Sequence, residues 1–291
     1  MGIFLQLVLS SVETGAVYAL MALGIITIYH TSLVINFSQG TIGMFGAFFV
    51  TTLFIKTGCP LPLAVAAGLL GALVIGWLVD VLVVRHLKEV GGAGKEISTL
   101  GLMLIFLGIT PLVFGTDPLR LPKLIEQGSV VIQGANLSYN SLLNIILGLA
   151  LTCGLFLMLQ QTKLGLGIRI TASNERTARL LGVPTEKITL FAWALAAMLA
   201  TMSGVMIGPA TQVSTNLMDY VTINALIACV LGGFQTFYGP VIAAYIIAIV
   251  NNLLTYYVSS VWGNQLMFII IIVFIIFKPV GLFGKQIVKK V

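Results

Sequence analysis

Long apolar runs follow one another along almost the whole chain, with short polar segments between them. The runs are continuous rather than alternating, which is typical of helices and not of barrel strands. Only these two structures satisfy their backbone hydrogen bonds in hydrocarbon, and a helix needs about 20 residues to cross it. We therefore expect one domain, residues 1–291, that is an all-α polytopic transmembrane bundle of about eight to nine spans. The spans are predicted near residues 4–29, 33–55, 61–84, 97–115, 142–160, 188–208, 219–234, 238–258 and 264–278.

Two of these predicted spans are irregular. Residues 219–234 are short and end in Gly232 and Gly233, while residues 35–46 place polar atoms and three glycines inside an apolar run. Helices can be discontinuous in a membrane where they line a cavity or are buried in protein. We predict that both segments contribute to a translocation path. The alternative is that the glycines only allow close packing.

Small residues recur every four positions on two other spans. Each series makes a smooth stripe along one helix face and lets a neighbouring backbone approach closely. The stripes therefore predict helix interfaces rather than sites. They comprise Ala64, Gly68, Ala72, Gly76 and Asp80 in one span, and Ala192, Ala196, Ala200, Gly204 and Gly208 in the other.

The composition supports a membrane protein. The chain is 58% hydrophobic and 8% charged and has a mean hydropathy of +1.09, whereas soluble domains carry about 25% charged residues. The start of the chain lacks the basic region and cleavage pattern of a signal peptide, so we expect it to be a retained first span. The net charge of +6 does not indicate nucleic acid binding, because the basic residues gather in segments between spans.

Three such basic segments set the predicted topology: residues 85–96, residues 161–187 and the tail from residue 278. The positive-inside rule places all three in the cytoplasm. Even numbers of spans separate them, so the N-terminus and residues 116–141 are expected outside. The basic residues are Arg85, Lys88 and Lys95; Lys163, Arg169, Arg176, Arg179 and Lys187; and Lys278, Lys285, Lys289 and Lys290.

The segment 161–187 is unusually polar for this chain. It holds seven charged residues, although the whole chain has only 15 basic and nine acidic ones. A membrane protein that concentrates its few charges in one loop is expected to build a docking surface there. The alternative is a helix that lies flat on the lipid headgroups.

Cap signals within this segment predict a short helix from about residue 173 to residue 181. A hydroxyl can cap its start, and a glycine followed by a proline ends it; opposite charges four residues apart stabilise it. Such a short helix is unstable alone in water and must pack against the bundle or a partner. The signals are Thr171 or Ser173, the pair Glu175 and Arg179, then Gly182 and Pro184. Apolar contacts are expected from Ala172, Leu180, Leu181 and Val183, and a basic face from Arg176 and Arg179.

No motif in the chain indicates an enzyme, a metal site or a cofactor site. The run GGAGKE at residues 91–96 resembles half of a phosphate-binding loop, but Glu89 replaces its first glycine and Glu96 its hydroxyl residue. Neither GxSxG nor HExxH occurs, and His30 and His86 stand alone near span ends. Three widely spaced cysteines indicate no disulfide framework or redox site.

One ionisable residue, Glu13, lies clearly within a predicted span, and the sequence shows no partner for it. Asp80 and Asp219 are close enough to span ends to reach water. A carboxylate inside a membrane is costly and is functional by default. A structural, hydrogen-bonded role and a pathway role both stay open for Glu13.

Four stretches together resemble one family: the branched-chain amino acid ABC transporter permeases, of the LivH-type inner-membrane subunit. They are GAVYALMALGIITIYHTSLVINFSQGTIGMFGAF at residues 15–48, ASNERTARLLGVP at 172–184, ACVLGGFQTFYGPVIAAY at 228–245 and FKPVGLFG at 277–284. They span most of the chain in the order that the family has. The resemblance implies a multi-pass subunit of the bacterial inner membrane.

In such permeases a cytoplasmic loop carries the coupling helix, which sits in a groove of the ATPase subunit. The resemblance gives this role to residues 172–182, with contacts from Ala172, Asn174, Glu175, Arg176, Arg179, Leu180, Leu181 and Gly182. The two irregular spans remain our candidates for the substrate path, with Asn36, Phe37, Ser38, Gln39, Gly40, Gly232 and Gly233 as its residues. Gln39 stands where the family commonly has His, and Thr41 where an acidic residue often follows. The substrate therefore stays open among branched-chain amino acids, other amino acids, urea and amides.

The resemblance also implies the partners. They are a second, homologous permease subunit in a heterodimer, two ATP-binding subunits and an external solute-binding protein, with membrane lipid around them and a small amino acid as substrate. The partner ATPases would bind and hydrolyse ATP, so this chain is expected to be no enzyme, to hold no cofactor and to bind no nucleic acid. The rival from another class is a self-contained carrier or channel.

Overall fold

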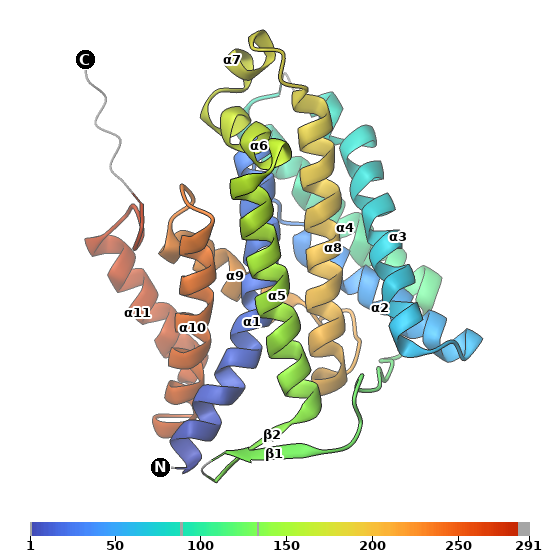
Figure 1. Cartoon of the computed structure of the whole chain (residues 1–291), viewed down its shortest axis with the longest axis vertical. Coiled ribbons are helices and arrows are strands. Elements are labelled where there is room, and N and C mark those ends of the chain that lie inside the picture. The colour runs from blue at the N-terminus through green and yellow to red at the C-terminus, as the bar shows by residue number, and fades with distance from the viewer. Residues whose placement is uncertain (1, 88–89, 133, 285–291) are drawn as a thin grey trace.

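The chain folds into a bundle of long helices, with short helices at one end and a β-hairpin at the other (Figure 1). This computed structural model describes residues 2–87, 90–132 and 134–284, without the side chains of Ile132 and Arg176. The long helices are α1 (Gly2–Ser32), α2 (Gln39–Thr57), α3 (Leu61–Leu82), α4 (Gly92–Phe114), α5 (Tyr139–Gln161), α8 (Thr185–Thr211) and α10 (Tyr238–Tyr257). The short elements are η1 (Val84–Leu87), α6 (Lys163–Ser173), α7 (Glu175–Leu180), α9 (Asp219–Gly232) and α11 (Gly263–Phe277).

The predicted helical bundle is confirmed in outline, with two differences. Among the described residues, seven helices are long and apolar enough to cross a membrane, and α9 and α11 are shorter, with 14 and 15 residues. A straight helix of 14 residues is about 20 Å long, less than the hydrocarbon layer of about 30 Å. In addition, the segment 116–141 contains an antiparallel hairpin of β1 (Ser129–Ile132) and β2 (Ala135–Ser138).

Helix α1 is the centre of the bundle. Its residues 15–28 are all buried, because α5, α8, α9 and α10 surround it. A helix that is apolar on every side is stable only when neighbours cover all of it. Polar side chains connect its first half to distant helices. Asn252 donates to the Ser11 hydroxyl (2.9 Å), and the Ser203 hydroxyl lies between the Val17 carbonyl of α1 (3.2 Å) and the Leu199 carbonyl of its own helix (3.0 Å).

The two stripes of small residues are helix interfaces, as predicted. All members of both series are buried. A β-carbon on Gly76 of α3 would lie 2.5 Å from the carbonyl oxygen of Trp193 in α8, and one on Gly204 of α8 would lie 2.8 Å from the carbonyl oxygen of Gly43 in α2. Backbones in such close contact tolerate no side chain between them.

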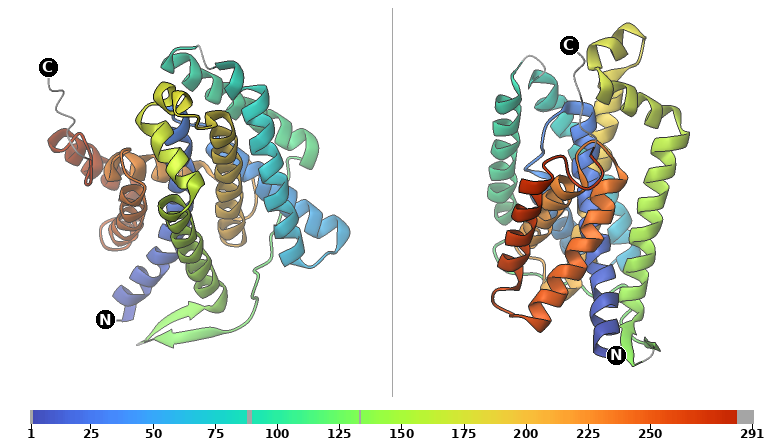
Figure 2. Two further views of the ribbon diagram at one scale, coloured as in Figure 1. Left: turned by 45° about the horizontal axis from the view of Figure 1, so that its top comes forward. Right: turned by 90° about the vertical axis from the view of Figure 1, so that its left-hand side faces the viewer.

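The predicted basic segments meet at one end of the bundle. Figure 2 shows α6 and α7 there, opposite the N-terminus and the hairpin. At the other end Gln6 of α1 and Asn136 of β2 exchange two hydrogen bonds, of 3.0 and 2.6 Å. This arrangement agrees with the predicted topology, while its sidedness stays a prediction. Lys88, Glu89, Lys285, Lys289 and Lys290 lie outside the described residues.

Candidate functional site

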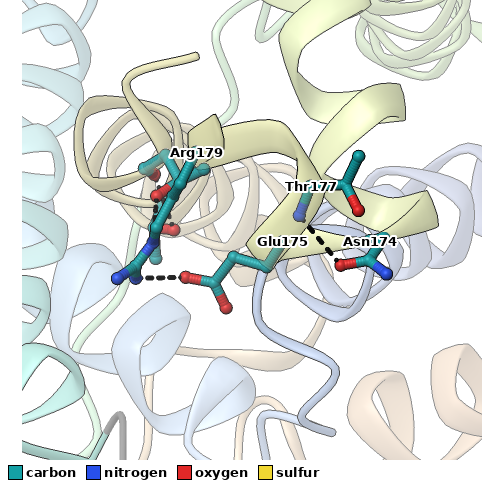
Figure 3. Close-up of polar contacts among 6 residues, drawn as sticks. Asn174, Glu175, Thr177 and Arg179 are labelled. Atoms are coloured by element: carbon teal, nitrogen blue, oxygen red, sulfur yellow. Dashed lines mark hydrogen bonds and ion pairs between the residues drawn. The ribbon is translucent and has the colours of Figure 1, made fainter. Parts of the chain in front are cut away.

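The polar segment 161–187 forms two helices rather than the one that was predicted. α6 ends at Ser173, and the predicted helix of residues 173–181 is the shorter α7. The predicted cap is wrong: Thr171 is buried within α6, and Asn174 caps α7 by accepting from the Thr177 amide at 3.1 Å (Figure 3). The reason is an earlier cap, since Thr162 accepts from the Gly165 amide and starts a helix that includes residues 171–173.

The predicted end of α7 is confirmed. Gly182 has φ +79°, the left-handed conformation that costs glycine least. Its amide donates to the Arg179 carbonyl, and the Val183 amide donates to the Ala178 carbonyl, both at 3.0 Å. These two bonds are those of a Schellman motif, which satisfies the last carbonyls of the helix.

The charges of α7 are partly engaged within the loop itself. Arg179 forms an ion pair with Glu175, as predicted from their spacing (Figure 3). Its Nε also donates to the Thr185 hydroxyl of α8 at 3.0 Å. Arg179 therefore anchors α7 to the bundle as well as carrying part of the predicted basic face. The side chain of Arg176 lies outside the described part of the structure.

Apolar side chains of α7 divide between the bundle and the solvent. Ala178 is fully buried, whereas Leu180 is 88% exposed and Leu181 is 70% exposed. Ala172 belongs to α6 and is half-buried. Two adjacent leucines are thus exposed at the end of a helix that is capped at both ends, and we call residues 180–182 the α7 tip. Such exposed apolar groups mark contact surfaces.

The predicted path segment near residue 36 is not a break inside a helix. α2 starts at Gln39, so the polar residues before it form a loop between α1 and α2. Asn36 donates to Gln39 Oε1 (3.0 Å) and accepts from the amide (3.1 Å) and hydroxyl (2.7 Å) of Ser38. Gln39 donates to the Ala196 carbonyl of α8 at 2.8 Å. All three side chains are fully buried, and their hydrogen bonds close the loop onto α8.

Sequence reasoning missed the residue that holds this loop from the other side. Thr99 of α4 accepts from the Phe37 amide at 3.2 Å, and its hydroxyl lies 3.3 Å from the Ile35 carbonyl and 2.8 Å from the Glu96 carbonyl of its own helix. A buried threonine in an apolar helix has no local signal for such a contact. The loop is therefore fixed between α4 and α8.

Replacing Asn36 by alanine should destabilise the protein by about 2 kcal/mol, because three buried partners lose their hydrogen bonds. Thermal unfolding in detergent measures this loss. Asn216→Ala is the control, since Asn216 is exposed and its loss should change the unfolding temperature little. Equal unfolding temperatures for the two variants would contradict the assigned role of Asn36.

The predicted path residues do not form one cluster. Gly40 packs against Thr222 near the start of α9, whereas Gly232 packs against the backbone of Gly239 and Pro240 at its end. About 15 Å of helix separates these contacts. Gly233, with φ +93°, faces the Val280 carbonyl and Gly284. The role of these residues in substrate contact stays a prediction.

The carboxylates of Asp80 and Glu13 have surroundings that differ from the predicted ones. Asp80 does not reach water: it is 1% exposed, and Arg85 donates to it at 3.1 Å. Glu13 has a partner after all, because the buried Asn144 of α5 donates to its Oε1 at 2.8 Å. Both partners come from packing that the sequence does not display.

Replacing Glu13 by glutamine should preserve transport, because the amide oxygen can still accept from Asn144. Glu13→Leu should lower thermal stability by about 1–3 kcal/mol, since one N–H of the buried Asn144 amide loses its acceptor and only the longer bond to the Met206 carbonyl remains. Substrate uptake and thermal unfolding of the two variants measure both effects. A loss of uptake in Glu13→Gln at unchanged stability would instead show the pathway role.

Comparisons with known proteins decide the family. The family described as branched-chain amino acid transport system / permease component matches residues 7–276. The chain belongs to this family. It is similar to the high-affinity branched-chain amino acid transport permease LivH of Escherichia coli K12, with 27% identity over 99% of this chain and 98% of the relative. No solved structure matches the chain.

Two further permeases have similar coverage. A probable branched-chain amino acid transport permease LivH of Methanocaldococcus jannaschii is 29% identical over 91% of this chain and 88% of the relative. The permease BraD of Pseudomonas aeruginosa is 24% identical over 99% of this chain and 98% of the relative. This chain is therefore a permease and a multi-pass membrane protein, and the predicted resemblance is confirmed.

Proposed function

We propose that the chain is the membrane permease subunit of an ATP-driven importer for branched-chain or similar hydrophobic amino acids in the bacterial inner membrane. Membership of the permease family supports the transport role, and the names of full-length relatives support the substrate class. Substrate passage needs no covalent chemistry, so the chain would hold no cofactor, and ATP would be bound by partner subunits.

The α7 tip is the observation that carries the coupling proposal. Leu180 and Leu181 are exposed there, on a helix that is capped at Asn174 and Gly182. The tip lies at the end of the bundle where the basic segments gather. We propose that α7, supported by α6, is the coupling helix and inserts its leucines into a groove of an ATPase subunit. Movement of that subunit would push on Arg179 and Thr185 and so on α8, which packs against α1, α2 and α3.

The complete importer would contain a second, homologous permease in a heterodimer, two ATPase subunits and an external solute-binding protein. The short helices α9 and α11 would complete eight to nine crossings together with the seven long ones. α9 is too short to cross alone and begins inside the bundle, because Thr222 touches Gly40 at the start of α2. Such half-helices are typical of transport paths.

Competition for uptake tests the substrate class. A host without its own branched-chain uptake would express this chain with its partner subunits. Leucine, isoleucine and valine should each suppress entry of labelled leucine, while urea and acetamide should not. Entry of labelled urea or acetamide without entry of leucine would show that the substrate assignment is wrong.

A further inference from the structure

A pocket beneath α7 lies apart from the exposed leucines of the α7 tip and from the predicted path residues. It lies where the last turn of α1, the end of α3 with η1, the first turns of α4 and the start of α8 meet. Thr31, Arg85, Leu102, Glu175 and Thr189 line it from these elements and from α7. The pocket therefore touches both the coupling loop and the bundle.

The charges of the pocket are balanced. Three acidic and three basic side chains line it, together with a wall of aliphatic residues. Arg85 is paired with Asp80 and Arg179 with Glu175, so the lining has no excess of either charge. A zwitterion keeps that balance, whereas a simple anion or a simple cation would disturb it. The acidic residues are Asp80, Glu175 and Glu186, and the basic ones are Arg85, Lys95 and Arg179.

Two hydrogen-bond donors of the pocket have no acceptor among the described residues. The indole Nε1 of Trp193 is one, and the side chain is only 2% exposed; the hydroxyl of Ser32 is the other. Leaving such a buried donor unsatisfied costs about 1–3 kcal/mol, so native proteins nearly always pair them. A ligand with acceptor oxygens would supply the partners that these donors lack.

We propose that this pocket binds a zwitterionic amino acid with an apolar side chain. Its carboxylate accepts from Trp193 and Ser32, its ammonium group lies against the acidic residues, and its side chain packs on Val34 and Leu102. The choice of amino acid and the cytoplasmic side rest on the proposed function. A ligand here holds α7 against α1 and α4, so product that accumulates inside slows further import.

Tryptophan fluorescence tests the site directly. The chain has three tryptophans, and Trp77 and Trp262 are 46% and 63% exposed, so the double variant Trp77→Phe, Trp262→Phe should fold and leaves Trp193 as the reporter. Leucine added to the full chain in detergent should change its emission in a saturable way. Leucinol, which lacks the carboxylate, and 4-methylpentanoate, which lacks the ammonium group, should not do so.

Ser32→Ala in this reporter background should weaken leucine binding about tenfold, because one hydrogen bond to a charged group is lost. Thr57→Ala is the control. It removes an exposed hydroxyl at the last residue of α2, away from the pocket, and this variant should bind leucine as before. A Trp193 emission that does not respond to leucine, responds equally to leucinol, or is indifferent to Ser32→Ala would overturn the proposal.

Uptake by the complete transporter separates this proposal from the proposed function. Leucine loaded inside vesicles should slow leucine uptake, and Ser32→Ala should relieve the inhibition. If leucine is imported but Trp193 does not respond, the pocket proposal fails and the transport function stands. If Trp193 responds to leucine although none is imported, the site stands and the transport assignment is wrong.

Discussion

Replacing Leu180 and Leu181 together by aspartate should reduce ATP-driven leucine uptake at least tenfold, with the protein still inserted and folded. The two side chains contact solvent rather than the bundle, so their loss should not affect the fold. Burial of a leucine in a partner groove contributes about 1.5–3 kcal/mol, and about 1.4 kcal/mol corresponds to a factor of ten in binding. Co-purification of the ATPase subunit and uptake at equal expression measure the effect.

The matched control for this variant is Gln160→Asp with Gln161→Asp. Both glutamines are exposed at the end of α5, so the control adds the same two charges at the same end of the bundle but away from the α7 tip. It should retain uptake. Normal uptake and co-purification in the leucine double variant would show that α7 is not the coupling helix, and a lipid-surface role would then be favoured.

Replacing Gly232 by alanine should destabilise the fold by about 3 kcal/mol, the upper range for overpacking. A β-carbon there would lie 2.2 Å from the carbonyl carbon of Gly239 and 2.4 Å from the nitrogen of Pro240. Both are backbone atoms, which cannot move without separating α9 from α10. Thermal unfolding in detergent should show the loss of stability. The maximal rate of uptake should fall as well, because less of the protein is folded.

Gly108→Ala is the control for this change, because nothing lies within 4 Å of the added carbon. Alanine there should be neutral or stabilise α4 by up to about 1 kcal/mol. Uptake kinetics and thermal unfolding of Gly232→Ala together distinguish a packing role of Gly232 from a role in substrate contact. A raised KM for leucine at unchanged thermal stability would favour the path role and contradict the packing role.

Local signals in the sequence predicted the parts of the structure that local physics determines. The apolar runs located the long helices, the stripes of small residues identified helix faces that lie in interfaces, and Gly182 with Pro184 located the end of α7. Each of these signals is formed by residues that are close to one another in the sequence. The start of α7 was misplaced because Asn174 and Ser173 are both good caps, and only the length of α6 decides between them.

Contacts between distant residues were beyond the reach of a single sequence. Asn144 lies 131 residues from Glu13, and Thr99 lies 62 residues from Phe37, so nothing near either residue indicates its partner. The burial of Asp80 depends in the same way on α8, against which α3 packs. The pocket around Trp193 joins five segments of the chain, and such an assembly becomes visible only in the folded protein.

Reconstitution into proteoliposomes tests the central claim most directly. Vesicles with this chain alone, and vesicles with the chain, its second permease, the ATPase subunits and the solute-binding protein, would be compared for leucine uptake with and without ATP. The account predicts uptake only in the complete assembly and only with ATP. Leucine transport by this chain alone, unaffected by ATP, would contradict it and identify a self-contained carrier or channel.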